Sequence, residues 1–251
     1  MHAEVFNLSS IARRSVFWND FSPRPGFTLI ELLTVISVLG ILASLTLPVV
    51  LRSKDLAART IDVGNLKQLT SATHIYASDN ADTMPWPNWL RGDGPGSRGW
   101  LYTFNESASG PNRFNVETGV LWPILKTRKL YWCPRDKPAH PMFKWRDQQS
   151  SSYVMNGAVC GYKRTLNPPL KLGSFVPEAV CYWETDENDP TFFNDGASNP
   201  DEGVSTRHNS GAICATFSGS VSHVKFAAWN RDAAATNKNR LWCCPISSDG
   251  R

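Results

Sequence analysis

The chain has 251 residues, of which 41% are hydrophobic and 19% charged, and its formal net charge is +4. This composition is that of a folded protein and excludes a disordered or low-complexity chain. Arg13, Arg14 and Arg24 lie in the first 26 residues. These residues also contain Glu4 and Asp20, so the remainder keeps a formal net charge of only +3, and nothing in it predicts nucleic-acid binding.

An apolar run covers residues 27–51 and contains one charged side chain, Glu31. Because roughly 20 apolar residues cross a bilayer as a helix, the run predicts a membrane-spanning segment. The basic residues before it predict that its amino-terminal side stays in the cytoplasm. Ordinary secretory cleavage near Ala43 is an alternative, but such signals have a shorter apolar core of about 7 to 15 residues.

The residues around Glu31 read Gly26-Phe27-Thr28-Leu29-Ile30-Glu31. This pattern resembles the class III signal of type IV prepilins and pseudopilins. The resemblance implies that a prepilin peptidase removes residues 1–26 as a leader, cutting between Gly26 and Phe27, and methylates the new amino terminus at Phe27. It also implies that Glu31 pairs with the amino-terminal nitrogen of a neighbouring subunit during filament assembly.

The chemistry of Glu31 agrees with this resemblance. A carboxylate in hydrocarbon is costly and usually has a partner. Removal of the leader creates an α-amino cation one helical turn before Glu31, and this cation attracts the acid strongly where the dielectric constant is low. The alternative is an exposed acid at a helix start, where the helix dipole favours it.

Beyond residue 51 the pattern predicts an amphipathic continuation of the helix over residues 52–78. Its apolar stripe has three- to five-residue spacing and consists of Ala58, Ile61, Leu66, Leu69, Thr73 and Tyr76. Residues 79–251 are expected to form one exported α+β domain. The expected fold is pilin-like: a long amino-terminal helix packed on a small antiparallel sheet.

Short runs rich in strand-forming residues predict the strands of this sheet. They lie at residues 129–134, 152–157 and 179–183, with an Asn-Gly turn at the end of the second. The clearest signal is a hairpin over residues 212–225 with a two-residue turn at Ser218-Gly219. Residues 84–99 are expected to form a loop whose large rings, Trp86 and Trp89, either cover the core or bind a partner together with the neighbouring Trp100.

The order of these segments resembles a bacterial family of pilin-like proteins with a carboxy-terminal signature of His, nine residues, then Asp-Gly. His208 and the pair Ser218-Gly219 match this spacing, but Ser218 stands where the family has Asp. We expect His208 to pin its loop to the hairpin through hydrogen bonds. A catalytic role for it is disfavoured because no nucleophile pattern accompanies it.

Six cysteines follow the apolar run. Their even number permits disulfides, whereas the absence of pairs spaced by two residues disfavours a zinc site made from them. No cofactor is expected, although an acidic loop could hold Ca²⁺. The calcium candidates are Glu184, Asp186, Glu187 and Asp189.

Two classes of function follow. The first is a non-enzymatic structural subunit of a type II secretion pseudopilus or a type IV pilus-like filament, with prepilin peptidase and other pilin-like subunits as partners. It would span the bacterial inner membrane once, with its carboxy-terminal domain in the periplasm or on the cell surface. The second is an individually anchored envelope protein that binds a ligand such as glycan. The sequence assigns no role to residues 229–251.

Overall fold

The computed structural model describes residues 26–89, 98–162 and 166–251. The expected leader, apart from Gly26, and part of the tryptophan-rich loop lie outside these residues. The described chain divides at Val49 into two compact units, and helix α1, Leu29–Asp79, contains residues of both. This helix continues through Pro48, because a proline removes one hydrogen bond of the helical ladder without preventing the turns on either side.

The first unit consists of the apolar part of α1. Every described residue from Gly26 to Leu51 is exposed, including Leu29 at 82% and Val38 at 55%. The helix contains a segment with a mean hydropathy of 2.3 that is long and apolar enough to cross a membrane. Apolar side chains therefore cover this part of α1 on all sides. Membrane-spanning helices share this pattern, whereas the surface helices of soluble domains are apolar on one face only.

The second unit contains a sheet of five strands in the order β5-β3-β4-β6-β7. All neighbours in it are antiparallel except β3 and β5. The strands are β3 Tyr153–Asn156, β4 Val180–Glu184, β5 Ala197–Ser198, β6 Gly211–Thr216 and β7 Val221–Lys225, and a separate small sheet pairs β1 Thr103–Phe104 with β2 Phe114–Asn115. The predicted α+β, pilin-like class is confirmed.

The remaining elements are short helices. Among the described residues, two α-helices follow α1, namely α2 Trp122–Leu125 and α3 Phe226–Ala234. The 3-10 helices are η2 Gly110–Arg113, η3 Val116–Thr118, η4 Arg128–Tyr131, η5 Phe143–Trp145, η6 Gly157–Cys160, η8 Leu172–Ser174, η9 Pro190–Phe193 and η10 Pro200–Glu202. The expected strand at residues 129–134 is therefore wrong, since its first half is helix η4.

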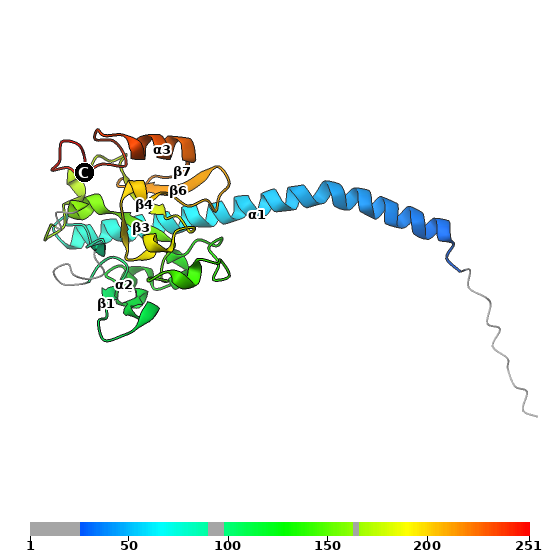
Figure 1. The fold of residues 1–251 in the computed structure, drawn as a ribbon, viewed down its shortest axis with the longest axis horizontal. Helices are drawn as coiled ribbons and strands as arrows, with labels where there is room; N and C mark the ends of the chain where they lie inside the picture. The colour runs from blue at the N-terminus through cyan, green and yellow to red at the C-terminus, as the bar shows by residue number, and fades with distance from the viewer. Residues whose placement is uncertain (1–25, 90–97, 163–165) are drawn as a thin grey trace, which may run out of the picture. The chain divides into compact units, whose positions relative to one another are not determined.

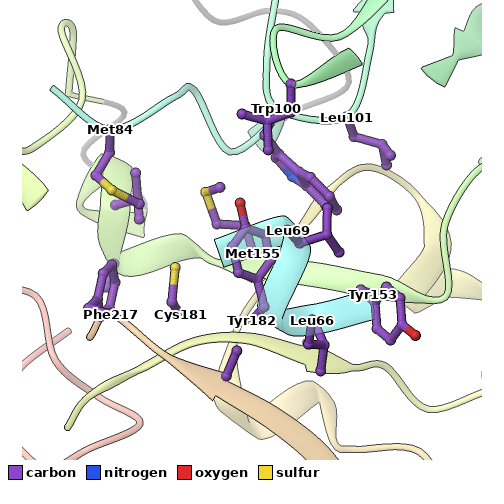
Figure 2. Packing of buried hydrophobic residues seen from close by; sticks show 14 of the residues in the cluster. Leu66, Leu69, Met84, Trp100, Leu101, Tyr153, Met155, Cys181, Tyr182 and Phe217 are labelled. Atoms are coloured by element: carbon purple, nitrogen blue, oxygen red, sulfur yellow. The ribbon is translucent and has the colours of Figure 1, made fainter. Parts of the chain in front are cut away.

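The main core lies between α1 and the sheet. Figure 2 shows Leu66 and Leu69 of α1 beside Met155 and Tyr182 of the sheet, and all four side chains are fully buried. Thr73 of α1 also shares a hydrogen bond of 2.8 Å with the Tyr182 hydroxyl. Close packing of large side chains on both partners fixes the carboxy-terminal half of the helix against the strands.

The other face of the sheet carries a second core beneath α3, which lies beside β7 and β6 (Figure 1). Trp183 of β4 packs there against Trp229 of α3, with ring centroids 5.3 Å apart. Both faces of the sheet are thus covered, which explains why β3 and β4 are buried at every position.

Three details differ from the sequence expectations. Ile61 is half exposed while its neighbour Asp62 is fully buried. The hairpin of β6 and β7 pairs Ala215 with Val221. Its loop therefore has three residues, Phe217 to Gly219, and not the two expected at Ser218-Gly219. Gly219 has a φ of +85°, and a three-residue hairpin loop needs a residue with positive φ there. Asn156 caps helix η6 through its side chain instead of opening a hairpin.

Candidate functional site: the apolar segment and a buried charged cluster

The amino-terminal site consists of Gly26, Phe27 and Glu31 at the start of α1. The Glu31 carboxylate accepts hydrogen bonds from the backbone N–H of Thr28 at 2.9 Å and from the Thr28 hydroxyl at 2.7 Å. The Glu31 N–H in turn donates to the Thr28 hydroxyl oxygen at 3.2 Å. This reciprocal arrangement is a capping box, which satisfies backbone donors at the first turn of the helix.

Both bonds to the Glu31 side chain use the oxygen Oε2. Oε1 is therefore open to a cation that approaches from outside the helix. Gly26 and Phe27 precede the helix and are exposed, and a Cβ built on Gly26 meets no atom within 4 Å. No described part of the chain therefore covers the peptide bond between Gly26 and Phe27.

The second site surrounds His208 and lies inside the second unit. The His208 Nε2 is 2.6 Å from Asp62 Oδ2 of α1 and 3.4 Å from Glu184 Oε1 at the end of β4. The Cys133 thiol lies 3.1 Å from the same Asp62 oxygen and 3.6 Å from His208 Nε2. All four side chains are buried. The His208 side chain therefore ties its loop to α1, while its carbonyl oxygen accepts the N–H of Gly211 at the start of β6, the hairpin contact that the sequence suggested.

Arginines border this group. Arg207 lies 3.2 Å from Asp136 and 3.6 Å from Glu187, and Arg146 binds Asp136 with two parallel contacts of 2.8 and 3.1 Å. The guanidinium groups compensate carboxylates that would otherwise be buried without a partner. We refer to these residues as the buried charged cluster: Asp62, Cys133, Asp136, Arg146, Glu184, Glu187, Arg207 and His208.

The cluster shifts the pKa values of its members. Burial lowers the pKa of His208, but the hydrogen bond to Asp62 and the negative charges of Asp62 and Glu184 outweigh it and raise the value to about 9. Burial, together with the charges of Glu184 and Asp62, raises the pKa of the Cys133 thiol. Without a further cation, the imidazole is therefore held protonated and the thiol neutral at neutral pH.

The calcium candidates do not converge. Glu184 belongs to the cluster, but Asp186 accepts a hydrogen bond from Asn188 and Asp189 caps helix η9. Glu187 binds the hydroxyls of Ser205 and Thr206 in addition to Arg207. Nor do Ser218 and Gly219 meet His208, because they lie in the turn at the opposite end of β6, whose six residues span about 20 Å.

The sequence reasoning missed Asp62 and Cys133. A usable signal existed for Asp62, since it is spaced four residues from both Ala58 and Leu66 and so lies on the buried stripe of α1. A charged residue on such a stripe indicates a buried partner. The six cysteines, Cys133 among them, are buried thiols without disulfides, so the even cysteine count carried no information about pairing.

Comparison with known proteins concerns mainly the amino-terminal segment. A model of the prokaryotic N-terminal methylation motif matches residues 22–47. Type II secretion system core protein G of Pseudomonas aeruginosa is 44% identical over 55 residues, which are 22% of this chain and 39% of that protein. The corresponding protein of Klebsiella michiganensis is 45% identical over 56 residues, again 22% of this chain and 39% of the relative.

The chain thus matches less than half the length of these curated relatives. No solved structure is significantly similar to it. Within the matched segment, the motif and the relatives confirm the resemblance that Gly26 to Glu31 predicts. In its amino-terminal region the chain is prepilin-like and pseudopilin-like, with one apolar helix suited to single-pass membrane anchoring.

Proposed function

We propose that the protein is a pilin-like structural subunit, a pseudopilin. Prepilin peptidase cleaves it between Gly26 and Phe27 and methylates Phe27, and the processed chain assembles through residues 27–51 into a type II secretion pseudopilus or a type IV pilus-like filament. The observation that carries this proposal is a helix exposed and apolar on all sides, with a single carboxylate in its first turn.

The physical argument concerns the two environments that such a helix tolerates. Lipid tails satisfy its apolar faces before assembly, and packed helices of other subunits satisfy them afterwards. Since lipid and helix surfaces are similarly apolar, specific polar contacts and packing decide between them. Glu31 supplies that contact when its Oε1 pairs with the amino terminus of a neighbouring subunit.

Location and partners follow from the same proposal. The processed protein spans the bacterial inner membrane once, with residues 79–251 in the periplasm or on the cell surface. Its partners are prepilin peptidase and other pilin-like subunits, and its work is mechanical, not enzymatic. The cysteine thiols are too deeply buried to act as surface nucleophiles.

The alternative of a glycan-binding envelope protein loses its main support. Of the three tryptophans that suggested a binding surface, Trp100 is fully buried and Trp86 is 6% exposed. Trp89 packs edge-on against Tyr162 at 6.1 Å. These rings fill the core, so no aromatic platform for a sugar remains at this loop among the described residues.

The test is a Glu31→Leu variant expressed in the native host. We expect normal membrane insertion and a methylated Phe27 at the amino terminus, measured by mass spectrometry, together with loss of the protein from sheared filaments. Thr28→Val is the matched control, because it removes the capping hydroxyl but keeps the carboxylate. It should still assemble.

A second variant tests processing separately. Gly26→Val adds a side chain where the structure has open space, so the fold is preserved while the peptidase site changes. We expect the unprocessed chain to accumulate in the membrane. Normal filaments from Glu31→Leu, or a native amino terminus that retains residues 1–26, would contradict the proposal.

A further inference from the structure

Four side chains from four separate segments converge in the second unit: Asp62 from α1, Cys133 after η4, Glu184 from β4 and His208 before β6. Each offers one atom that can bind a metal, and these atoms all lie within 4.8 Å of one another. Consecutive members of this group are 24 to 71 positions apart along the chain. Only the packing of α1 on the sheet brings them together.

The distances resemble those of a tetrahedral site. With zinc bonds of about 2.0 to 2.3 Å, neighbouring ligand atoms lie about 3.3 to 3.7 Å apart. His208 Nε2 is 3.6 Å from Cys133 Sγ and 3.4 Å from Glu184 Oε1. Asp62 Oδ2 is closer, at 2.6 Å from His208 Nε2 and 3.1 Å from Cys133 Sγ. A shift of this one oxygen by less than about 1 Å would open the tetrahedron.

One ligand atom is left unsatisfied. Glu184 Oε1 is buried and accepts no well-formed hydrogen bond among the described residues, and its nearest cationic atoms are His208 Nε2 at 3.4 Å and Arg207 Nη1 at 3.8 Å. Its sister oxygen accepts the Ile213 N–H at 2.8 Å, which directs Oε1 toward His208. A buried carboxylate oxygen without a hydrogen bond is costly. A cation between the four side chains would remove that cost.

Outer contacts orient the other ligands, as around known metal sites. The Tyr153 hydroxyl donates to Asp62 Oδ1, and the Arg135 N–H donates to Cys133 Sγ at 3.3 Å. His208 Nδ1 faces Asp55 Oδ1 at 3.6 Å. Asp62, Cys133 and Glu184 therefore each have a hydrogen bond outside the group that orients them, whereas His208 Nδ1 only faces a carboxylate.

The ligand chemistry selects the metal. A thiolate and an imidazole favour zinc, whereas calcium and magnesium prefer sites made of oxygen atoms alone. Asp62, Glu184 and a Cys133 thiolate carry three negative charges, of which a divalent cation neutralises two. Arg207 Nη1, 3.8 Å from Glu184 Oε1, lies close to the remaining charge.

We propose that Asp62, Cys133, Glu184 and His208 bind one structural Zn²⁺ ion, which joins α1 to the sheet. The four protein ligands leave no open position, so the ion is structural and not catalytic. This inference does not depend on assembly into a filament. A surface cleft of about 300 Å³ is lined by Asp136 and by Arg207 and Asn209, the chain neighbours of His208.

The experiment uses the full-length protein in detergent, purified without chelators. Elemental analysis should give about one zinc ion per chain. After chelation and reconstitution with Co²⁺ alone, the near-ultraviolet absorption spectrum should contain the thiolate-to-cobalt charge-transfer band. Cys133→Ser should abolish that band, whereas Cys160→Ser, which alters a buried cysteine in η6 outside the group, should keep it.

If Cys133→Ser does not fold, as judged by near-ultraviolet circular dichroism, the wild-type spectrum still decides. A thiolate band at one cobalt per chain, lost on addition of stoichiometric zinc, supports the site. No bound zinc and no thiolate band in folded wild-type protein would overturn the proposal. The cluster would then be a metal-free ion network.

Discussion

Replacing Asp136 by Asn should strongly destabilise the second unit, because this carboxylate is shared by two buried arginines. It binds Arg146 at 2.8 and 3.1 Å and Arg207 at 3.2 Å, and the Ser152 hydroxyl donates to it at 2.9 Å. The side chains of all three charged residues are at most 4% exposed. The Asn side chain has the same shape as that of Asp but carries no charge. The two buried guanidinium groups would therefore lose the negative charge that they share.

The magnitude follows from the cost of breaking a buried ion pair, about 3 to 5 kcal/mol. For a domain of this size, 1 kcal/mol shifts the melting temperature by about 2 to 4 °C. The expected decrease in Tm is therefore about 6 to 20 °C. Surface pairs differ, because water screens them and their contribution is about 0 to 1 kcal/mol.

The assay is thermal unfolding of the full-length protein in detergent, followed by near-ultraviolet circular dichroism. All tryptophans except Trp18 lie beyond residue 79, so the signal reports mainly on the second unit. The matched control is Glu117→Gln, which breaks an exposed ion pair with Arg128 at 2.9 Å. Its Tm should decrease by no more than about 4 °C. Equal shifts in the two variants would refute the reasoning that burial makes the Asp136 pairs important.

Three further predictions concern the same unit. His208→Ala should lower the Tm, because Asp62 loses its partner at 2.6 Å; an unchanged melt would contradict this. Leu69→Ala should cost about 2 to 5 kcal/mol in chemical unfolding, since the side chain is fully buried, while exposed Ile75→Ala should cost much less. Burial raises the pKa of Glu187, but Arg207 and hydroxyl donors lower it below its ordinary value. The resulting stabilisation is present above about pH 4.3 and is lost on further acidification, so Glu187→Gln should show a smaller loss of stability than wild type between about pH 5 and 3.

The amino-terminal segment could be predicted from the sequence because its information is local. The residues from Gly26 to Glu31 are contiguous, and the apolar run of α1 needs no partner within the chain to be recognised. The same holds for β4 and for the hairpin of β6 and β7, where runs of strand formers indicated the elements. The predicted length of the hairpin loop was wrong. Gly219, which has a positive φ, is the third residue of a three-residue loop and not the second residue of a two-residue turn.

The buried charged cluster could not be predicted, because its information is spread along the chain. Asp62 and His208 are 146 positions apart and meet only through the packing of α1 on the sheet. Metal-site reasoning from cysteine spacing considered thiols close together in sequence, whereas Cys133 has its partners in three other elements. The one local signal was the position of Asp62 on the buried stripe of α1. The apolar residue Ile61 beside it was assigned to that stripe instead.

Under the proposed function, the capping box at Glu31 bears on how one helix would serve both membrane and filament. Cleavage before Phe27 leaves Thr28 in the chain, so both of its bonds to Glu31 Oε2 can persist in the processed protein. The carboxylate is then held toward the amino-terminal end of its own helix, with Oε1 directed away from these bonds. A neighbouring amino terminus can bind Oε1 without disrupting the cap. Assembly would then add an ion pair to an acid that is already oriented, which reduces the conformational entropy lost on pairing.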